Sequence, residues 1–265
     1  MTETIRIGDL TVLCKRPHLP TRPPVLFVHG YFADATIFEA WLDFFAARGV
    51  PSYAVNLRGR AGSRPGIDLG RASIEDFADD ASVVAKTLDK PAVVGHSMGG
   101  LIAQKLAERG DVSAAVLVTP APPRGISVLS PKVAIKQLRY LPRILTSRVV
   151  VPDREDLRSL ILNHVPAELQ DAILDRLIPD SGRAGRDMSV TGVPVDAARV
   201  RCPVLAITTD DDHFIPGRIV ERIARRYSAT LHILKTRGHM LLLEPGWGQI
   251  ADLIDHWIRD HTIKA

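Results

Sequence analysis

The chain has 265 residues, enough for one large domain with a complete hydrophobic core or for one domain that carries a sizeable insertion. Its residues are 46% hydrophobic and 24% charged, a balance that excludes intrinsic disorder. The net charge of +4 comes from arginines scattered along the chain, and the lack of a dense basic block argues against nucleic-acid binding.

The N-terminal sequence and the two cysteines bear on the cellular compartment that we expect for this chain. The opening MTETIRIGDL lacks the basic and apolar regions of a secretory signal, and no apolar run is long enough to span a bilayer, so we expect a cytoplasmic protein without a membrane segment. Cys14 and Cys202 lie far apart in apolar contexts, which favours two buried thiols over a disulfide. No histidine, cysteine or aspartate cluster has metal-ligand spacing, so we expect neither metal nor cofactor. Nothing distinguishes a monomer from a homodimer.

The first 120 residues alternate strand-like and helix-like runs. Residues 4–7 and 10–15 predict two short strands around a Gly8-Asp9 turn, and the wholly apolar run 25–28 predicts a strand buried on both faces. Ser73 and Asp76, three residues apart, have the spacing of a capping box at a helix start. Further strands are predicted at 51–55, 92–95 and 114–118, and helices at 35–48, 73–89 and 98–109.

The alternation stops between residues 120 and 200, where no convincing strand is found and helix-like pieces cover 131–147, 154–164 and 167–177. It returns with strands at 204–208 and 231–234 and helices at 217–227 and 246–260. Such alternation implies a parallel sheet with helices on both faces. We therefore expect a core of residues 1–120 and 201–265, and a helical cap or lid over 121–200, because insertions in such folds lie near the ligand. A second small domain with an unrelated role is the alternative.

Ser97 lies in the sequence GHSMG, between the predicted strand 92–95 and the predicted helix 98–109. This context matches the G-x-S-x-G elbow, in which a sharp turn lifts a nucleophilic serine above the sheet. A tight turn with a serine N-cap would give a similar pattern without chemistry. A serine hydroxyl also needs a base, an orienting acid and oxyanion donors.

The base and the acid are expected after the later strands. His239 lies in the loop that follows strand 231–234, and we expect it, rather than His96, to be the base. Three carboxylates, at Asp210, Asp211 and Asp212, follow strand 204–208. Asp212 is the favoured orienting acid and Asp211 the second choice, while Asp210 is expected to cap the turn.

The oxyanion donors are expected to be backbone amides on either side of Ser97. The amide of Met98, directly after the serine, supplies one. The loop after strand 25–28 supplies the other, from Tyr31 or, one residue later, from Phe32. His29 in the same loop is expected to shape the backbone rather than act as a second base.

Four motifs carry a resemblance that covers nearly the whole chain: VHGY at 28–31, GHSMGG at 95–100, DDHFIP at 211–216 and GHMLLLEP at 238–245. In their residues and their Ser, Asp, His order the chain resembles the α/β-hydrolase fold superfamily, as a serine esterase-like member with a helical cap. The resemblance implies an α/β fold with a mostly parallel, eight-stranded sheet flanked by helices. It also implies a variable cap inserted after the sixth strand, here at 120–200.

One loop departs from the superfamily pattern. Many relatives have an aspartate followed by a glycine-serine loop after the fourth strand, and here Asn56 stands in its place, followed by Arg58 and Arg60. Altered loop packing is the favoured interpretation. The weaker hypothesis is that Arg58 or Arg60 favours anionic substrates.

The resemblance and the site together imply acyl transfer to water through an acyl-enzyme on Ser97, with a small or medium, largely apolar carboxylic ester as substrate. The expected apolar lining comes from Val128, Leu129, Val133, Ile135, Leu138, Tyr140, Leu141, Ile144 and Leu145. The alternatives are lactone, thioester or carbon–carbon bond hydrolysis, cofactor-free oxygenase or perhydrolase chemistry, and a small-molecule binding protein of the same fold. A haloalkane dehalogenase is excluded because that chemistry needs an aspartate at the position of Ser97.

Overall fold

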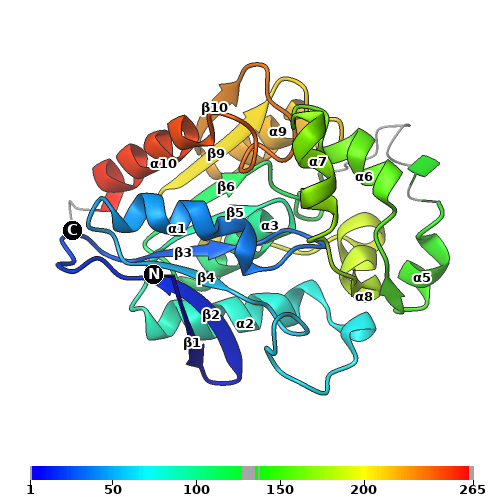
Figure 1. Cartoon of the computed structure of the whole chain (residues 1–265), viewed down its shortest axis with the longest axis horizontal. Helices are drawn as coiled ribbons and strands as arrows, with labels where there is room; N and C mark the ends of the chain where they lie inside the picture. Colours follow the sequence, from blue (N-terminus) through cyan, green and yellow to red (C-terminus); the bar gives the residue numbers. More distant parts are fainter. Residues whose placement is uncertain (1, 127–134, 137, 263–265) are drawn as a thin grey trace.

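The computed structural model describes residues 2–126, 135–136 and 138–262 (Figure 1). Its main sheet has eight strands in the order β1-β2-β4-β3-β5-β6-β9-β10. The first two strands form an antiparallel hairpin, β2 pairs antiparallel with β4, and the remaining neighbours are parallel. The strand bounds are β1 Glu3–Ile7, β2 Leu10–Lys15, β3 Val25–Val28, β4 Ser52–Val55, β5 Ala92–His96, β6 Ala114–Val118, β9 Val204–Thr209 and β10 Thr230–Leu234.

The central strands are buried along their whole length, as their uninterrupted apolar sequences predict. Every residue of β3, β5, β6 and β9 is buried, because helices cover both faces of this part of the sheet. The parallel register pairs Val28 with Gly95 and His96 with Val118, so these strands end side by side. The loops that follow them therefore meet at one edge of the sheet, where ligands bind in such folds.

Helices form a layer on each face (Figure 1). On one face, Trp41 and Phe45 of α1 (Glu39–Ala46) pack against Phe27 of the sheet, and Trp257 of α10 (Trp247–Thr262) belongs to the same apolar cluster. On the other, Phe77 and Leu101 belong to a larger apolar cluster formed by α2 (Ile74–Thr87), α3 (Met98–Arg109) and α9 (Gly217–Tyr227). The predicted capping box is present, since the side chains of Ser73 and Asp76 each accept the other's backbone N–H.

Residues 121–200, called the inserted segment from here on, follow the sixth strand. The labelled helices of this segment lie on the right of Figure 1. The backbone of Ile178 donates to the carbonyl of Phe32, in the loop after β3, at 2.9 Å. The expectation that this segment has no strand is wrong: Val149 pairs with Ser181 and Val150 with Asp180. Two residues per strand are too few for a periodic sequence signal. The segment contains α5 Leu141–Leu145, β7 Val149–Val150, α6 Arg154–Ile161, α7 Ala167–Leu174, β8 Asp180–Ser181, α8 Gly182–Arg186, η3 Asp187–Thr191 and η4 Ala197–Arg199.

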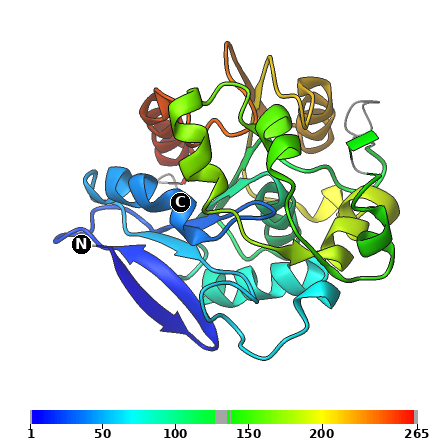
Figure 2. The ribbon, with the colours of Figure 1, turned by 45° about the vertical axis from the view of Figure 1, so that its right-hand side comes forward.

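Two short 3-10 helices complete the secondary structure, η1 Ala35–Phe38 before α1 and η2 Leu69–Arg71 before α2. Of the predicted helix at 131–147, residues 135–136 and α5 are helical and 138–140 form a turn, while 131–134 and 137 lie outside the described residues. Within the described ranges, no helix has the length and apolar character needed to cross a membrane. Figure 2, turned by 45°, shows the inserted segment in front of the sheet and apart from the β1–β2 hairpin.

Candidate active site

Ser97 lies at the turn from β5 into α3, with a positive φ of 55° that is strained for a residue other than glycine. The glycines around it are needed for space. A Cβ on Gly95 would lie 2.1 Å from the carbonyl oxygen of Gly99, and a Cβ on Gly99 would lie 2.1 Å from that of Val28. The sequence GHSMG therefore folds into the sharp elbow that its glycines predict.

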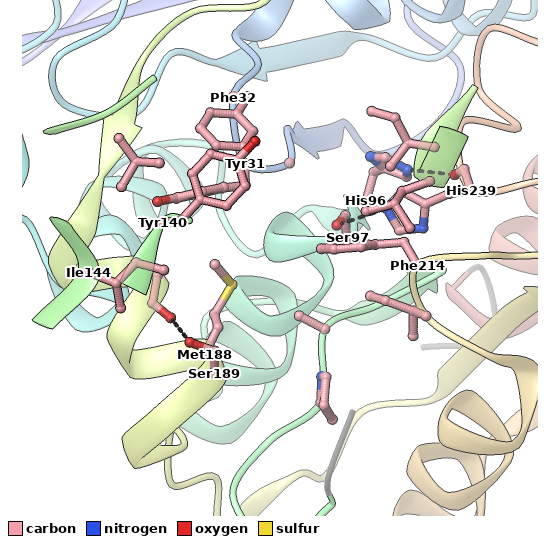
Figure 3. A pocket seen from close by; sticks show the side chains of 18 of the residues that line it. Tyr31, Phe32, His96, Ser97, Tyr140, Ile144, Met188, Ser189, Phe214 and His239 are labelled. Carbon is pink, nitrogen blue, oxygen red and sulfur yellow. Dashed lines mark hydrogen bonds between the residues drawn. The ribbon is translucent and has the colours of Figure 1, made fainter. Parts of the chain in front are cut away.

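His239 lies beside Ser97, although 142 residues separate them in the chain (Figure 3). Its Nε2 lies 3.0 Å from Ser97 Oγ, and its Nδ1 lies 2.8 Å from Asp212 Oδ2. The His239 residue is only 2% exposed, so water does not compete for these contacts. The three residues form one hydrogen-bonded chain at the carboxyl edge of the sheet.

The three aspartates after β9 have separate environments. The other oxygen of Asp212, Oδ1, accepts the backbone N–H groups of Phe214 and Ile215 at 2.8 and 2.7 Å, which fixes the carboxylate. Asp211 points away, toward His164 of the inserted segment, at 2.8 Å. Asp210 accepts the N–H of Thr236 at 2.8 Å and so ties two loops together. The structure brings Asp212, and not Asp211, to His239.

Two residues whose role the sequence did not predict, His96 and Glu244, hold the backbone at and next to His239. His96 Nε2 lies 3.0 Å from the carbonyl oxygen of His239, and burial, with the nearby His239, lowers the pKa of His96 to about 3. His96 is therefore neutral and donates from Nε2. One residue before His239, the N–H of Gly238 donates to Glu244 Oε1 at 2.9 Å, and burial raises the pKa of this carboxyl. Glu244 is the seventh residue of the GHMLLLEP motif, so its place in that motif was the sequence feature that could have indicated this role.

The two predicted oxyanion amides flank Ser97. Met98 is the first residue of α3, where backbone N–H groups have no partner within the helix. The N–H of Phe32 donates to Asp180 Oδ2 at 2.8 Å, whereas the N–H of Tyr31 has no acceptor among the described residues. A Cβ on Gly30 would come within 3.2 Å of Ser97 Cβ, so this loop lies close against the serine. The geometry favours Tyr31 over Phe32.

His29 shapes this loop, as expected. Burial, with the charge of Arg60, lowers its pKa to about 3, so the ring is neutral. Its Nδ1 contacts the carbonyl oxygen of Gly30 at 2.9 Å, and its Nε2 lies 3.4 Å from the N–H of Leu57.

A cavity of about 470 Å³ opens onto Ser97 and His239 (Figure 3). Its volume lies within the range usual for small-molecule sites. Of the apolar residues expected to line it, Tyr140 and Ile144 do so. Ile135, Leu138 and Leu145 are instead at least half exposed, and Leu141 is not among the lining residues. Val128, Leu129 and Val133 lie outside the described residues. Most other apolar lining residues come from loops, from α6 and from the short helices η1 and η3: Phe32, Ile37, Ile126, Leu157, Leu160, Ile161, Met188, Phe214 and Met240.

The two arginines after β4 do not line this cavity. Arg58 contacts Asp76 and Asp80 at 2.8 Å each, and Arg60 forms an ion pair with Asp180 in which both side chains are fully buried. The hypothesis that either arginine receives an anionic substrate is therefore not supported, and altered loop packing accounts for both. Asn56, in place of the usual acid, accepts the N–H of Ala35 at 3.0 Å.

An eight-stranded, mostly parallel sheet with a serine at a glycine-flanked elbow defines the α/β-hydrolase architecture. The chain matches the model of the alpha/beta hydrolase family over residues 25–252, and it belongs to this family. A monoacylglycerol lipase from Mycolicibacterium smegmatis is 28% identical over 272 residues, which cover 92% of this chain and 91% of that protein.

Solved structures share the fold. The monoacylglycerol lipase of Paleococcus ferrophilus has a TM-score of 0.72 at 24% identity, over 95% of this chain and 99% of that one. An esterase from Thermogutta terrifontis has a TM-score of 0.73 at 20% identity, over 99% of each chain. The predicted superfamily and sheet are confirmed, and the names of these proteins agree with the predicted class of enzyme, a hydrolase acting on ester bonds.

Proposed function

We propose that the protein is a serine hydrolase that cleaves small or medium, largely apolar carboxylic esters through an acyl-enzyme on Ser97. The observation that carries the proposal is the hydrogen-bonded chain from Asp212 through His239 to Ser97, which ends in the cavity. A serine so placed has the base and the orienting acid that its weakly nucleophilic hydroxyl needs.

In the proposed first step, Ser97 Oγ attacks the ester carbonyl while His239 Nε2 takes the hydroxyl proton. Asp212 keeps the Nδ1 proton of His239 in place and stabilises the imidazolium that forms. The imidazolium then protonates the departing alcohol, and the acyl group remains on Ser97. In the second step His239 takes a proton from water, the hydroxide attacks the acyl-enzyme, and the carboxylic acid leaves as Ser97 regains its proton.

The negative charge on the carbonyl oxygen is assigned to the backbone amides of Tyr31 and Met98. Preorganised donors at this position stabilise the transition state more than the ground state, because the charge develops only as the bond to Ser97 forms. Two observations support this assignment: the Tyr31 amide has no acceptor within the described part of the chain, and Met98 stands at a helix start.

Residues 121–200 are proposed to be the cap over a core of residues 1–120 and 201–265. Side chains of Ile144, Leu157, Leu160 and Met188 from the inserted segment line the same cavity as Ser97. Because this wall is mostly apolar, it suits the hydrocarbon part of an ester. The monoacylglycerol lipase relative makes monoacylglycerols a reasonable member of the substrate panel.

The experiment combines fluorophosphonate labelling with turnover of p-nitrophenyl esters of increasing chain length, monoacylglycerols, lactones, thioesters and diketones. We expect labelling at Ser97, and a loss of about 10⁴- to 10⁶-fold in kcat for Ser97→Ala, because a nucleophile and its base act as a unit. Undiminished turnover by Ser97→Ala would contradict the proposal. Absence of labelling and of turnover in the wild type would favour a binding protein of the same fold.

A further inference from the structure

We propose that the buried pair of Arg60 and Asp180 is the positioning element of the oxyanion loop, the segment from Gly30 to Phe32. The pair acts through the backbone of Phe32 and touches no substrate, so Arg60 and Asp180 are positioning residues. The inference rests on the proposed function, because the oxyanion loop matters only if Ser97 forms a tetrahedral intermediate.

Both polar backbone groups of Phe32 are bound by the inserted segment. The N–H of Phe32 donates to Asp180 Oδ2 at 2.8 Å, and its carbonyl oxygen accepts the N–H of Ile178 at 2.9 Å. Phe32 has a φ of 64°, in the left-handed region that residues other than glycine rarely adopt. A residue keeps such a conformation only where its surroundings fix it. Here the fixing contacts come from residues 178–180.

The preceding peptide is fixed from the other side. His29 is neutral, and its Nδ1 donates to the carbonyl oxygen of Gly30 at 2.9 Å. In a planar trans peptide the carbonyl and the following N–H point in opposite directions. Binding the Gly30 carbonyl therefore sets the direction of the Tyr31 N–H. With Asp180 occupying the Phe32 amide, the Tyr31 amide is left as the donor next to Ser97.

Arg60 allows a carboxylate to serve in this place. Asp180 is fully buried, and an unpaired carboxylate there would be costly and would repel the negative charge that develops on the oxyanion. The guanidinium of Arg60, itself 1% exposed, pairs with Asp180 and lies over the ring of Phe77 at 4.7 Å. Its Nη1 also donates to the carbonyl oxygen of Arg58 at 2.9 Å. The pair is therefore electrically neutral and held by the core.

One further contact ties the same strand, β8, to the oxyanion loop, and another fixes the Asp180 carboxylate within the strand. The hydroxyl of Tyr31 donates to the carbonyl oxygen of Ser181 at 2.7 Å, and the N–H of Ser181 donates to Asp180 Oδ1 at 2.6 Å. The backbone and the side chain of the oxyanion loop thus bind β8 together. Both residues of this short strand are buried.

The test uses two variants of the full chain: Asp180→Ala, and the neutral double variant Arg60→Met with Asp180→Asn. Activity is divided by the number of Ser97 sites labelled by fluorophosphonate, so that unfolded protein does not count. We expect Asp180→Ala to lose about 10²-fold in kcat, in the range for loss of one oxyanion donor, with KM changed by less than about threefold. The affinity for a boronic acid, which forms a tetrahedral adduct with Ser97, should fall by the same factor as kcat/KM.

The double variant separates positioning from charge. An asparagine oxygen can still accept the Phe32 N–H, and Arg60→Met removes the cation that Asp180→Asn alone would leave unpaired. We expect it to recover at least about tenfold in kcat over Asp180→Ala. Because it buries no uncompensated charge, it also keeps the test informative if Asp180→Ala does not fold. The matched control is Asp255→Asn, which breaks the mostly buried pair of Arg22 with Asp255 of α10, at 2.7 Å, and should lower Tm without changing kcat.

Wild-type kcat and boronate affinity in Asp180→Ala would overturn the inference and leave an ion pair that only stabilises the fold. A double variant that recovers none of the loss would also contradict it. Where Asp180→Ala does not fold, a loss of about 10²-fold in kcat in the folded double variant, which keeps an acceptor for the Phe32 N–H, would contradict the positioning role. Failure of the proposed function has a different signature: the wild type would not be labelled at Ser97, or Ser97→Ala would keep its activity. In that case both proposals fall together. A drop in kcat with unchanged boronate affinity also contradicts the positioning role.

Discussion

The core and the inserted segment are built on different principles. The four central strands of the core are wholly buried, and their residues support each other through long-range parallel pairing. Most buried apolar residues of the inserted segment form a separate, much smaller cluster. Phe32 and Met240 of the core also belong to this cluster. It also carries large apolar side chains that are 45% exposed or more: Ile135, Leu138, Leu145, Val151, Leu169 and Val190.

This difference corresponds to a division of work at the site. Ser97, Asp212 and His239 all follow core strands, whose register fixes their separations to within hydrogen-bond distance. Much of the apolar cavity wall comes from the inserted segment, where packing is looser. We therefore expect changes in the core to act on Ser97, Asp212 and His239, and changes in the cavity wall of the inserted segment to act on KM.

The largest expected effect is on the core side of this comparison. Asp212→Asn should lower kcat by about 10⁴-fold, because the neutral amide no longer holds the required tautomer of His239 or stabilises its charged form. Asp211→Asn is the matched control, since its carboxylate binds His164 and its side chain is 51% exposed. We expect that variant to stay within about threefold of wild type. Steady-state kinetics on one p-nitrophenyl ester decide the matter, and the reverse ranking would assign the acid to Asp211.

A pair of truncations compares how the two regions are packed. Leu117→Ala, in fully buried β6, should lower the free energy of unfolding by about 3 kcal/mol, with KM unchanged. Leu160→Ala, in α6 at the cavity wall, should cost about 1 kcal/mol less, because the looser surroundings can close around the gap. It should also raise KM for apolar esters severalfold. Urea unfolding and KM for both variants test this.

An equal loss of stability in the two variants, with KM unchanged in Leu160→Ala, would show that the inserted segment is packed as tightly as the core and is not a substrate-facing wall. The alternative of a second domain with an unrelated role would then return.

The same contrast explains what the sequence could predict. The core elements repeat a simple pattern of apolar strand and amphipathic helix, so β3, α3 and β6 lie at their predicted residues. Ser97 and His239 follow such strands and have glycine within two residues, so the sequence could predict their place in the site. Within the inserted segment the short strands β7 and β8 carry no periodicity, and neither was predicted.

The contacts that connect distant segments were beyond sequence reasoning. Asp180 lies 148 residues from Phe32, and no local pattern at either position indicates that the side chain of one binds the backbone of the other. The same holds for His96, whose contact with the carbonyl of His239 spans 143 residues. Nothing in the sequence indicated that Arg60, in a loop expected to approach the pocket, is buried in an ion pair with Asp180.

The smallest expected effect concerns the buried histidines of the core. The pKa of His96 is lowered from 6.5 to about 3, so between these values the unfolded chain binds a proton that the folded chain does not. Stability is therefore fully present above pH 6.5 and falls as the pH is lowered toward 3. One such group contributes at most about 1.4 kcal/mol per pH unit. His29, with its pKa also lowered to about 3, contributes a second slope of the same sign.

His96→Gln keeps a donor for the carbonyl of His239 and removes the titrating group. We expect the slope of the unfolding free energy between pH 6 and pH 4.5 to decrease by about 1.4 kcal/mol per pH unit, measured by urea denaturation at several pH values. His256→Gln is the matched control, because the His256 side chain is 52% exposed on α10. An unchanged slope in His96→Gln would mean that His96 takes up its proton in the folded state. Below pH 6.5 the ring would then be a charged imidazolium rather than the neutral Nε2 donor that holds the His239 loop beside Ser97.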